Sequence, residues 1–235
     1  MICATLVASG AATAGSFQVS PVRIELTPTA PTAAITVRNE SATEAVVIQS
    51  RPVNWTQQDG KDVYVPSTAL IATPPIFTLQ PGATQTVRVG LRKAEPGDIQ
   101  QTFRIYLTEV PPPPKPGFQG LQVSLNIGIP IFIAPKTRTG GEPVWRAMVG
   151  ADGRLEVSAT NPANTHVQVL EFNLQDGGDS PVATTQEPRY ILAGQTVTWR
   201  LPTTRAPATS LRVKGRTDSG DVDAAVSLGS STTVR

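Results

Sequence analysis

The chain has 235 residues, of which 39% are apolar and 5% aromatic, and its formal net charge at pH 7 is +2. Its Lys and Arg residues are scattered and are not interleaved with aromatic residues, so the composition argues against a nucleic-acid-binding surface. Proline (22) and glycine (19) separate short runs rich in Val, Thr and Ile, which is typical of β-sandwiches. No segment keeps a helical period, and we expect almost no helix.

Residues 1–14 are expected to be the remnant of a signal peptide. Residues 2–14 are small and apolar, and Ala12-Thr13-Ala14 fits the small-x-small pattern of a signal-peptidase site. The segment is too short to span a membrane. The only cysteine, Cys3, lies within it, so an exported mature chain would contain no disulfide.

Short strands separated by turn residues are predicted along the rest of the chain, in two domains of residues 15–137 and 138–235. The polar segment Pro135–Glu142, with its paired glycines, is the expected boundary. The strands expected in the first domain are Ser16–Leu26, Ala33–Asn39, Ala45–Trp55, Ile76–Leu79, Gln85–Leu91, Thr102–Val110 and Leu121–Ile133. Those expected in the second are Val144–Val149, Arg154–Thr160, Val167–Gln175, Tyr190–Leu192, Thr196–Leu201, Leu211–Arg216 and Ala224–Ser227. The sequence therefore predicts an all-β chain of two β-sandwich domains.

The run Leu121–Ile133 (LQVSLNIGIPIFI) has a branched aliphatic residue at every odd position. In an extended strand these side chains share one face, because side chains alternate with period two. An ordinary strand has about five or six residues, and this run is much longer. One sandwich core cannot easily cover the whole apolar edge, so we expect another protein to cover part of it.

The residues needed for catalysis or metal binding are scarce. His166 is the only histidine, which argues against zinc and copper sites, and it is expected to be an exposed loop residue. Asp218, Asp221 and Asp223 are expected to lie on a solvated hairpin rather than in a cation site. No sequence motif of a nucleophilic or metal-dependent enzyme occurs. We therefore expect no enzymatic activity, no metal and no cofactor.

Four segments in the same order resemble the periplasmic pilus chaperones of the PapD-like family. They are Val19–Leu26 (VSPVRIEL) with the following Ala34–Asn39, then Ile71–Gly82 (IATPPIFTLQPG), Phe103–Pro111 (FRIYLTEVP) and the run Leu121–Ile133. The resemblance covers roughly residues 16–135, and it extends to the second domain only by pattern. It implies two immunoglobulin-like domains in an L-shaped arrangement and a periplasmic location.

The resemblance also implies a function. Chaperone–pilin pairs are a known example of strand addition, in which the chaperone lends a strand to a subunit that lacks its last one. The chaperone then delivers the subunit to an outer-membrane usher. The donor residues implied here are Leu121, Val123, Leu125 and Ile127, and their exposure in the free chain would favour self-association. The alternative is a two-domain immunoglobulin-like surface or adhesion protein whose aliphatic run is simply core.

The family holds the subunit's C-terminal carboxylate with two basic residues, and Arg23 matches the first of them. The second is a lysine on the donor strand, but Pro130 stands at that position here, and Ala134 replaces a nearby arginine. These departures indicate a divergent branch, of the archaic type associated with spore-coat-protein-U-like subunits. Arg104 and Arg88, which are predicted to lie on the non-core faces of their strands, are the candidates for the second cation.

Overall fold

The computed structural model describes residues 17–93, 95, 97–113, 123–150, 152–177, 181–203 and 210–229. All regular elements within these residues are β-strands, as the sequence predicts. The chain divides into two compact units. The first takes its described residues from Met1–Asn54, Pro66–Ala94 and Phe103–Ile131, and the second from Trp55–Val65, Glu95–Thr102 and Phe132–Arg235. Four of the described strands therefore cross between the units: Val46–Gln58 and Asn126–Ile133 end in the second unit, and Lys61–Pro66 and Gln101–Val110 begin in it.

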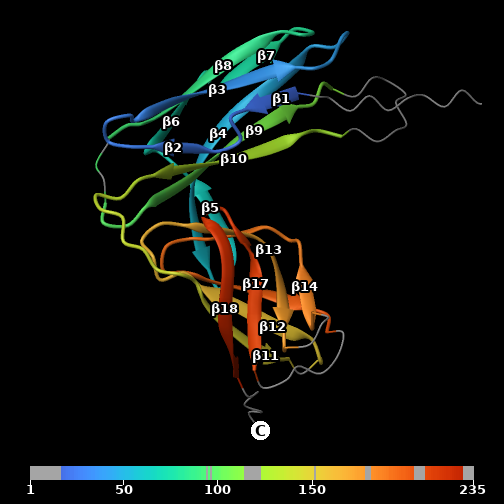
Figure 1. The fold of residues 1–235 in the computed structure, drawn as a ribbon. Coiled ribbons are helices and arrows are strands. Elements are labelled where there is room, and N and C mark those ends of the chain that lie inside the picture. The colour runs from blue at the N-terminus through green and yellow to red at the C-terminus, as the bar shows by residue number, and fades with distance from the viewer. Residues whose placement is uncertain are drawn as a thin grey trace, which may run out of the picture. The chain divides into compact units, whose positions relative to one another are not determined.

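Two sheets form the first unit (Figure 1). The β3 sheet has the order β1-β3-β8-β6, and the β10 sheet has the order β2-β10-β9-β4-β5 with β7 beside β4. The strands of the β3 sheet are β1 (Phe17–Ser20), β3 (Thr32–Asn39), β6 (Leu70–Thr73) and β8 (Thr84–Leu91). Those of the β10 sheet are β2 (Ile24–Leu26), β4 (Val46–Gln58), β5 (Lys61–Pro66), β7 (Ile76–Leu79), β9 (Gln101–Val110) and β10 (Asn126–Ile133).

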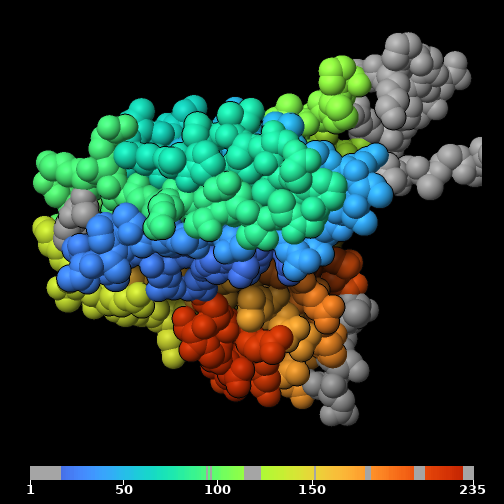
Figure 2. All heavy atoms as spheres, turned by 90° about the horizontal axis from the view of Figure 1, so that it is seen from above, coloured from blue at the N-terminus to red at the C-terminus, as the bar shows by residue number. Residues whose placement is uncertain are grey.

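Alternating side chains from both sheets fill the core of the first unit. The core residues include Ile35, Val37, Val87, Val89, Phe103, Ile105, Leu107, Ile129 and Ile131, each at most 4% exposed. The residues between them face outward, because side chains on a strand alternate between the two faces of the sheet. Figure 2 shows β3 in blue and β8 in teal-green side by side on one face of the unit, where β3 pairs with β8 in antiparallel register.

The predicted strand Ser16–Leu26 is divided in the structure. Its first part, β1, pairs with β3, whereas its second part, β2, pairs with β10 in the other sheet. Pro21 lies between the two parts, and a proline has no N–H to continue a ladder. The proline therefore marks the point at which the chain passes from one sheet to the other.

In the second unit, the strands after β10 form a sheet in the order β14-β13-β17-β18-β11-β12-β16, with β15 beside β13. Its strands are β11 (Val144–Val149), β12 (Leu155–Thr160), β13 (Val167–Gln175), β14 (Ala183–Thr185), β15 (Arg189–Ile191), β16 (Thr196–Leu201), β17 (Leu211–Thr217) and β18 (Gly220–Gly229). Trp145, Phe172 and Trp199 meet at the centre of its core, with ring centroids 5.1 to 5.9 Å apart. These large rings supply much of the apolar burial that stabilises the unit.

A buried asparagine organises one end of the first unit. The Asn39 side chain donates from Nδ2 to the carbonyl oxygens of Glu44 at 2.8 Å and Leu79 at 3.1 Å. Its Oδ1 accepts a hydrogen bond from the Ser41 backbone N–H at 2.9 Å. Nearby, Gly82 has φ +69°, a conformation that glycine adopts without steric cost. The asparagine thus ties the loop after β3 to the turn before β8.

The same arrangement recurs in the second unit around Asn161. Its Nδ2 donates to the carbonyl oxygens of Thr165 at 2.7 Å and Ile191 at 3.0 Å, and its Oδ1 accepts from the Ala163 N–H at 3.0 Å. Gly194, at φ +70°, takes the place of the glycine in the first unit. The two units therefore repeat one β-sandwich plan, in which β12 corresponds to β3 and β16 to β8.

Replacement of Gly215 by alanine is expected to destabilise the second unit. A Cβ at this position would collide with the carbonyl oxygen of Glu171 and lie 2.6 Å from the Cβ of Phe172. Because backbone atoms cannot move aside cheaply, Gly215→Ala should lower the free energy of unfolding by about 1–3 kcal/mol. Urea denaturation followed by tryptophan fluorescence measures this loss. Gly140→Ala is the control, since a Cβ there would meet nothing within 4 Å; equal stability of the two variants would contradict the prediction.

Candidate functional site

Exposure falls steadily along the apolar run that precedes and forms β10. Val123 is 49% exposed, whereas Ile129 and Ile131 are 1% and 0% exposed. Leu125 and Ile127, between them, are half-buried. Leu121 lies outside the described residues. The described part of the run therefore leaves the sandwich core gradually, and its first residues present aliphatic side chains to solvent.

The exposed start of the run is held beside β9. The Glu109 backbone N–H donates to the carbonyl oxygen of Leu125 at 2.9 Å, and the Leu125 N–H donates to the Glu109 side chain at 3.2 Å. Thr108 Oγ1 donates to the Asn126 side chain at 2.7 Å. These bonds extend the contact with β9 beyond the first residue of β10. The aliphatic side chains before β10 are thus presented on an ordered backbone.

The other edge of β10 is covered only in part by the neighbouring strand of the sheet. That neighbour is β2, which has three residues, whereas β10 has eight. Three residues cannot pair with eight, so part of this edge of β10 carries backbone groups that β2 does not satisfy. Such an edge can accept an added strand.

Phe132, near the end of β10, belongs to an aromatic cluster of the second unit. Its even position in the run predicts that its side chain lies on the face opposite the aliphatic residues. It is fully buried, and its ring stacks on His166 at 3.6 Å and lies 5.9 Å from Trp55 and 5.7 Å from Tyr190. Pro130 is also buried. Both faces of the strand are therefore covered at this end.

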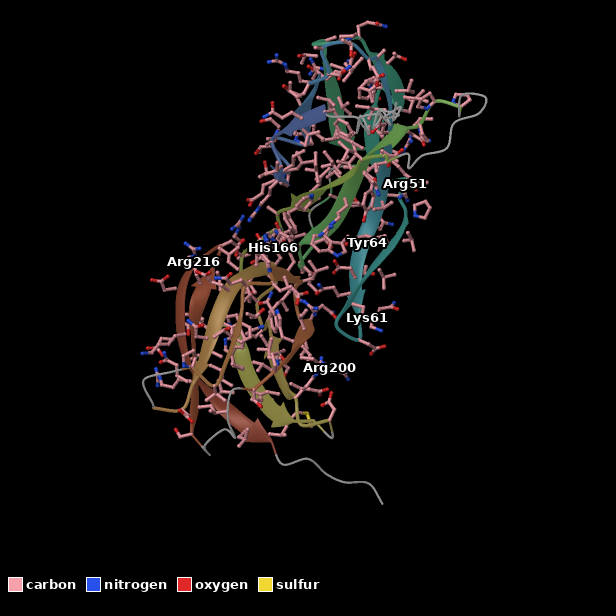
Figure 3. All side chains as sticks on the ribbon, turned by 90° about the vertical axis from the view of Figure 1, so that its right-hand side faces the viewer. Arg51, Lys61, Tyr64, His166, Arg200 and Arg216 are labelled. Atoms are coloured by element: carbon pink, nitrogen blue, oxygen red, sulfur yellow. The ribbon has the colours of Figure 1, made fainter. Side chains whose placement is uncertain are left out.

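The expectation that His166 is an exposed loop residue is wrong. Its side chain is only 4% exposed, and Figure 3 labels it on the ribbon of the second unit. Both its backbone N and its Nδ1 bond Oε1 of Gln100, at 2.9 and 2.7 Å, and its Nε2 lies 3.5 Å from Oδ2 of Asp218. Asp218 lies in the turn of the β17–β18 hairpin and is exposed, as predicted, although its side chain, turned toward His166, is only 15% exposed. The partners that bury His166 are distant in sequence, and the local turn pattern gives no sign of them.

Arg23 lies immediately before β2, on the outer face of the β10 sheet. The next residue, Ile24, is buried in the core, so Arg23 points the other way. It pairs with Glu25 at 2.7 Å, and its side chain remains 32% exposed. An arginine in this setting can bind a further carboxylate through its fork of N–H donors.

Arg104 shares this outer face, whereas Arg88 does not. Arg104 lies on β9 between buried Phe103 and Ile105, and is half-buried. Only β10 separates β9 from β2 in the sheet, which places the two strands about 10 Å apart. Arg88 is exposed on β8 in the β3 sheet, and the outer faces of two packed sheets point in opposite directions. The structure therefore brings Arg104, and not Arg88, onto the face of Arg23.

Sequence reasoning missed a three-residue stack on the same face. Arg51 of β4 pairs in register with Tyr106 of β9, and its guanidinium carbon lies 5.0 Å from the centroid of the tyrosine ring. On the other side of Tyr106 lies Gly128 of β10, where an added Cβ would be 2.9 Å from Cε1 of the ring. Gly128 is the one signal in the sequence that could have indicated this stack, because a glycine inside a strand often marks a site where another group approaches the backbone closely.

Neither a cluster of metal ligands nor a membrane-spanning helix occurs in the part of the chain that the structure describes. No group of three or more His, Cys, Asp or Glu residues among those residues is arranged to hold a metal ion. Nor does any helix there have the length and apolar character needed to cross a membrane.

Comparison with known proteins gives one family and several structural relatives. The sequence model of the family described as "Pili and flagellar-assembly chaperone, PapD N-terminal domain" matches residues 16–138. No curated protein matches the sequence.

Solved structures resemble the whole chain at low sequence identity. One is from the CsuC–CsuE chaperone–tip adhesion subunit complex of archaic chaperone-usher Csu pili of Acinetobacter baumannii, with a TM-score of 0.68 and 17% identity over 91% of this chain and 99% of that one. The YadV chaperone gives 0.65 and 18%, over 89% and 98%. The SafB chaperone in complex with SafA pilin from Salmonella enterica gives 0.61 and 20%, over 90% and 95%. At these identities the likeness is one of fold.

Proposed function

The chain belongs to the family of pili and flagellar-assembly chaperones with a PapD N-terminal domain, which covers residues 16–138, and from this premise we propose that it is a periplasmic chaperone for pilin-type subunits. It acts by binding and not by catalysis. It is exported by the signal peptide expected at residues 1–14, binds subunits by donor-strand complementation, and delivers them to an outer-membrane usher.

The single observation that carries this proposal is the segment that runs into β10. It offers aliphatic side chains at every second position, an ordered backbone held by β9, and an edge that the short β2 leaves partly open. A subunit that lacks a strand needs these three properties in a donor, because its groove is apolar and its sheet edge is unpaired. If Leu121, Val123, Leu125 and Ile127 are each buried at about 1.5–3 kcal/mol, they contribute about 6–12 kcal/mol before the costs of association.

Two features support the subunit class that we propose. The departures at Pro130 and Ala134 set the chain apart from the family's usual anchor, and one of the similar structures comes from an archaic chaperone-usher system. Both features support partners of the archaic, spore-coat-protein-U-like type. Until a subunit arrives, the exposed start of the run favours self-association of the free chaperone.

For the subunit's C-terminal carboxylate, the pair we favour is Arg23 with Arg104. The two lie on one face of the β10 sheet with a single strand between them, so both guanidinium groups can reach a carboxylate placed over β10. Two charge-assisted hydrogen-bond donors suit this role. Arg88 is the less favoured candidate, since it belongs to the β3 sheet.

Leu125→Glu is expected to abolish recovery of soluble subunit. The substitution places a charge on the face that must enter an apolar groove, where an unpaired carboxylate is strongly unfavourable. The measurement is co-purification of the pilin-type subunit encoded nearest this gene, co-expressed with the tagged chaperone. Val144→Glu is the matched control, because Val144 is a 51% exposed aliphatic residue on β11 of the second unit, outside the donor segment in sequence. Equal subunit yield from the two variants would refute the donor-strand proposal and favour the surface-protein alternative.

Arg23→Ala and Arg104→Ala should each lower the amount of co-purified subunit without unfolding the chaperone. Loss of a charge-assisted hydrogen bond corresponds to roughly a tenfold or greater loss of affinity. Arg88→Ala serves as the comparison and should retain the subunit. Circular dichroism verifies that each variant is folded. If Arg88→Ala loses the subunit while Arg104→Ala keeps it, the assignment of the second cation is reversed.

A further inference from the structure

The stack of Arg51, Tyr106 and Gly128 has no part in the anchor or the donor segment as proposed above. It crosses three adjacent strands of the β10 sheet, β4, β9 and β10, on the outer face. The absence of a side chain at Gly128 lets the Tyr106 ring approach the β10 backbone. The ring then supports the Arg51 guanidinium, whose carbon lies 5.0 Å from the ring centroid. Figure 3 labels Arg51 on β4.

Several arginines have a carboxylate partner within the chain, whereas the exposed Arg51, Arg88 and Arg146 have none among the residues that the structure describes. Arg51 differs from Arg88 and Arg146 in its contact with a tyrosine ring. Arg23, Arg189, Arg200 and Arg212 each lie within 2.9 Å of a carboxylate oxygen in the same chain. Among the residues that the structure describes, Arg51 has a ring contact but no ion pair or hydrogen bond. An exposed guanidinium with its N–H donors unused is well suited to a carboxylate from outside the chain.

Tyr106 gives Arg51 a fixed position. A cation over an aromatic ring is attracted by the negative face of the ring, and this limits the rotamers that the arginine samples. A side chain that is already ordered loses less entropy when it binds. Tyr106 is therefore a positioning residue, and Gly128 is the position in β10 that makes room for it.

The stack lies next to the donor segment. Gly128 directly follows Ile127, and a strand added at the open edge of β10 would be about 5 Å from β10 and about 15 Å from β4. Long side chains on the outer face of the added strand and of β4 can span this distance by reaching toward each other across Tyr106. The charged groups on this face include Arg23, Arg51 and Arg104, opposed by Glu25, so the face as a whole attracts an acidic group.

We propose that Arg51, held over Tyr106, binds a carboxylate of the bound subunit and selects among subunits by its presence. This inference rests on the proposed function and adds a contact separate from the Arg23–Arg104 pair. The carboxylate is supplied by an acidic side chain of the subunit, because the C-terminal carboxylate is assigned to the Arg23–Arg104 pair.

The test is the rate at which a purified chaperone–subunit complex exchanges its chaperone for a differently tagged wild-type chain. The subunit is the pilin-type protein encoded nearest this gene. Arg51→Gln should accelerate exchange roughly fivefold, the lower range for an exposed charge-assisted hydrogen bond. Arg146→Gln, at an exposed position on β11, is the matched control and should leave the rate unchanged. Equal rates for wild type and Arg51→Gln would overturn the proposal.

The role of Tyr106 is tested by a double-mutant cycle. Tyr106→Leu should accelerate exchange, and Tyr106→Phe, which keeps the ring, should restore the slow rate. The double variant of Arg51→Gln with Tyr106→Leu should exchange no faster than Arg51→Gln alone, because the ring acts through the arginine. Additive effects would contradict the positioning role.

Two altered subunits separate this contact from the Arg23–Arg104 pair. Replacement of the acidic residues of the subunit's last strand by their amides should abolish the difference in exchange rate between wild type and Arg51→Gln. Extension of the subunit by two glycines, which displaces its C-terminal carboxylate, should leave that difference in place, and the opposite pattern would overturn the proposal.

Failure of this proposal can be told apart from failure of the donor-strand proposal. If the donor-strand proposal is wrong, Leu125→Glu will bind the subunit normally. If only the Arg51 proposal is wrong, Leu125→Glu will not bind, while wild type and Arg51→Gln will exchange at equal rates.

Discussion

The structure depends on one constraint: both faces of β10 and one of its edges pack against other parts of the chain at the same time. Ile129 and Ile131 enter the core of the first unit, Phe132 enters the aromatic cluster of the second, and β9 occupies one edge. A shift of one residue would turn each of these side chains to the wrong face. The register of β10 is therefore fixed from its C-terminal end, and only the residues before it and the edge beside β2 remain for a partner.

The two units repeat one sandwich plan but differ in their first strand. In the second unit a single strand, β11, pairs with β12 on one side and, over three residues, in parallel with β18 on the other. In the first unit the corresponding strand is split between two sheets at Pro21, so that β1 pairs with β3 and β2 pairs with β10. Because Pro21 divides the strand, the neighbour of β10 is limited to the three residues of β2.

The features that the sequence predicts correctly are those set by local alternation. The inward positions of Val87, Val89, Phe103 and Ile105, and the outward position of Arg104 between the last two, follow from the two-residue period of a strand. Pairing between distant segments has no such local pattern. The burial of His166 depends on Gln100, 66 residues away, and the ring contact of Phe132 depends on Tyr190. Parity also placed Arg88 and Arg104 on non-core faces correctly, but it cannot say that those faces belong to different sheets.

The stack between Phe132 and His166 gives this chain an unusual spectroscopic property. Because the chain contains one histidine, its imidazole protons form a single set in a proton NMR spectrum. The phenylalanine ring lies 3.6 Å away and nearly parallel, at 11°, so its ring current shifts those resonances from their random-coil positions. One pair of peaks in an unlabelled sample therefore reports whether the end of β10 is seated, independently of the state of the rest of the strand.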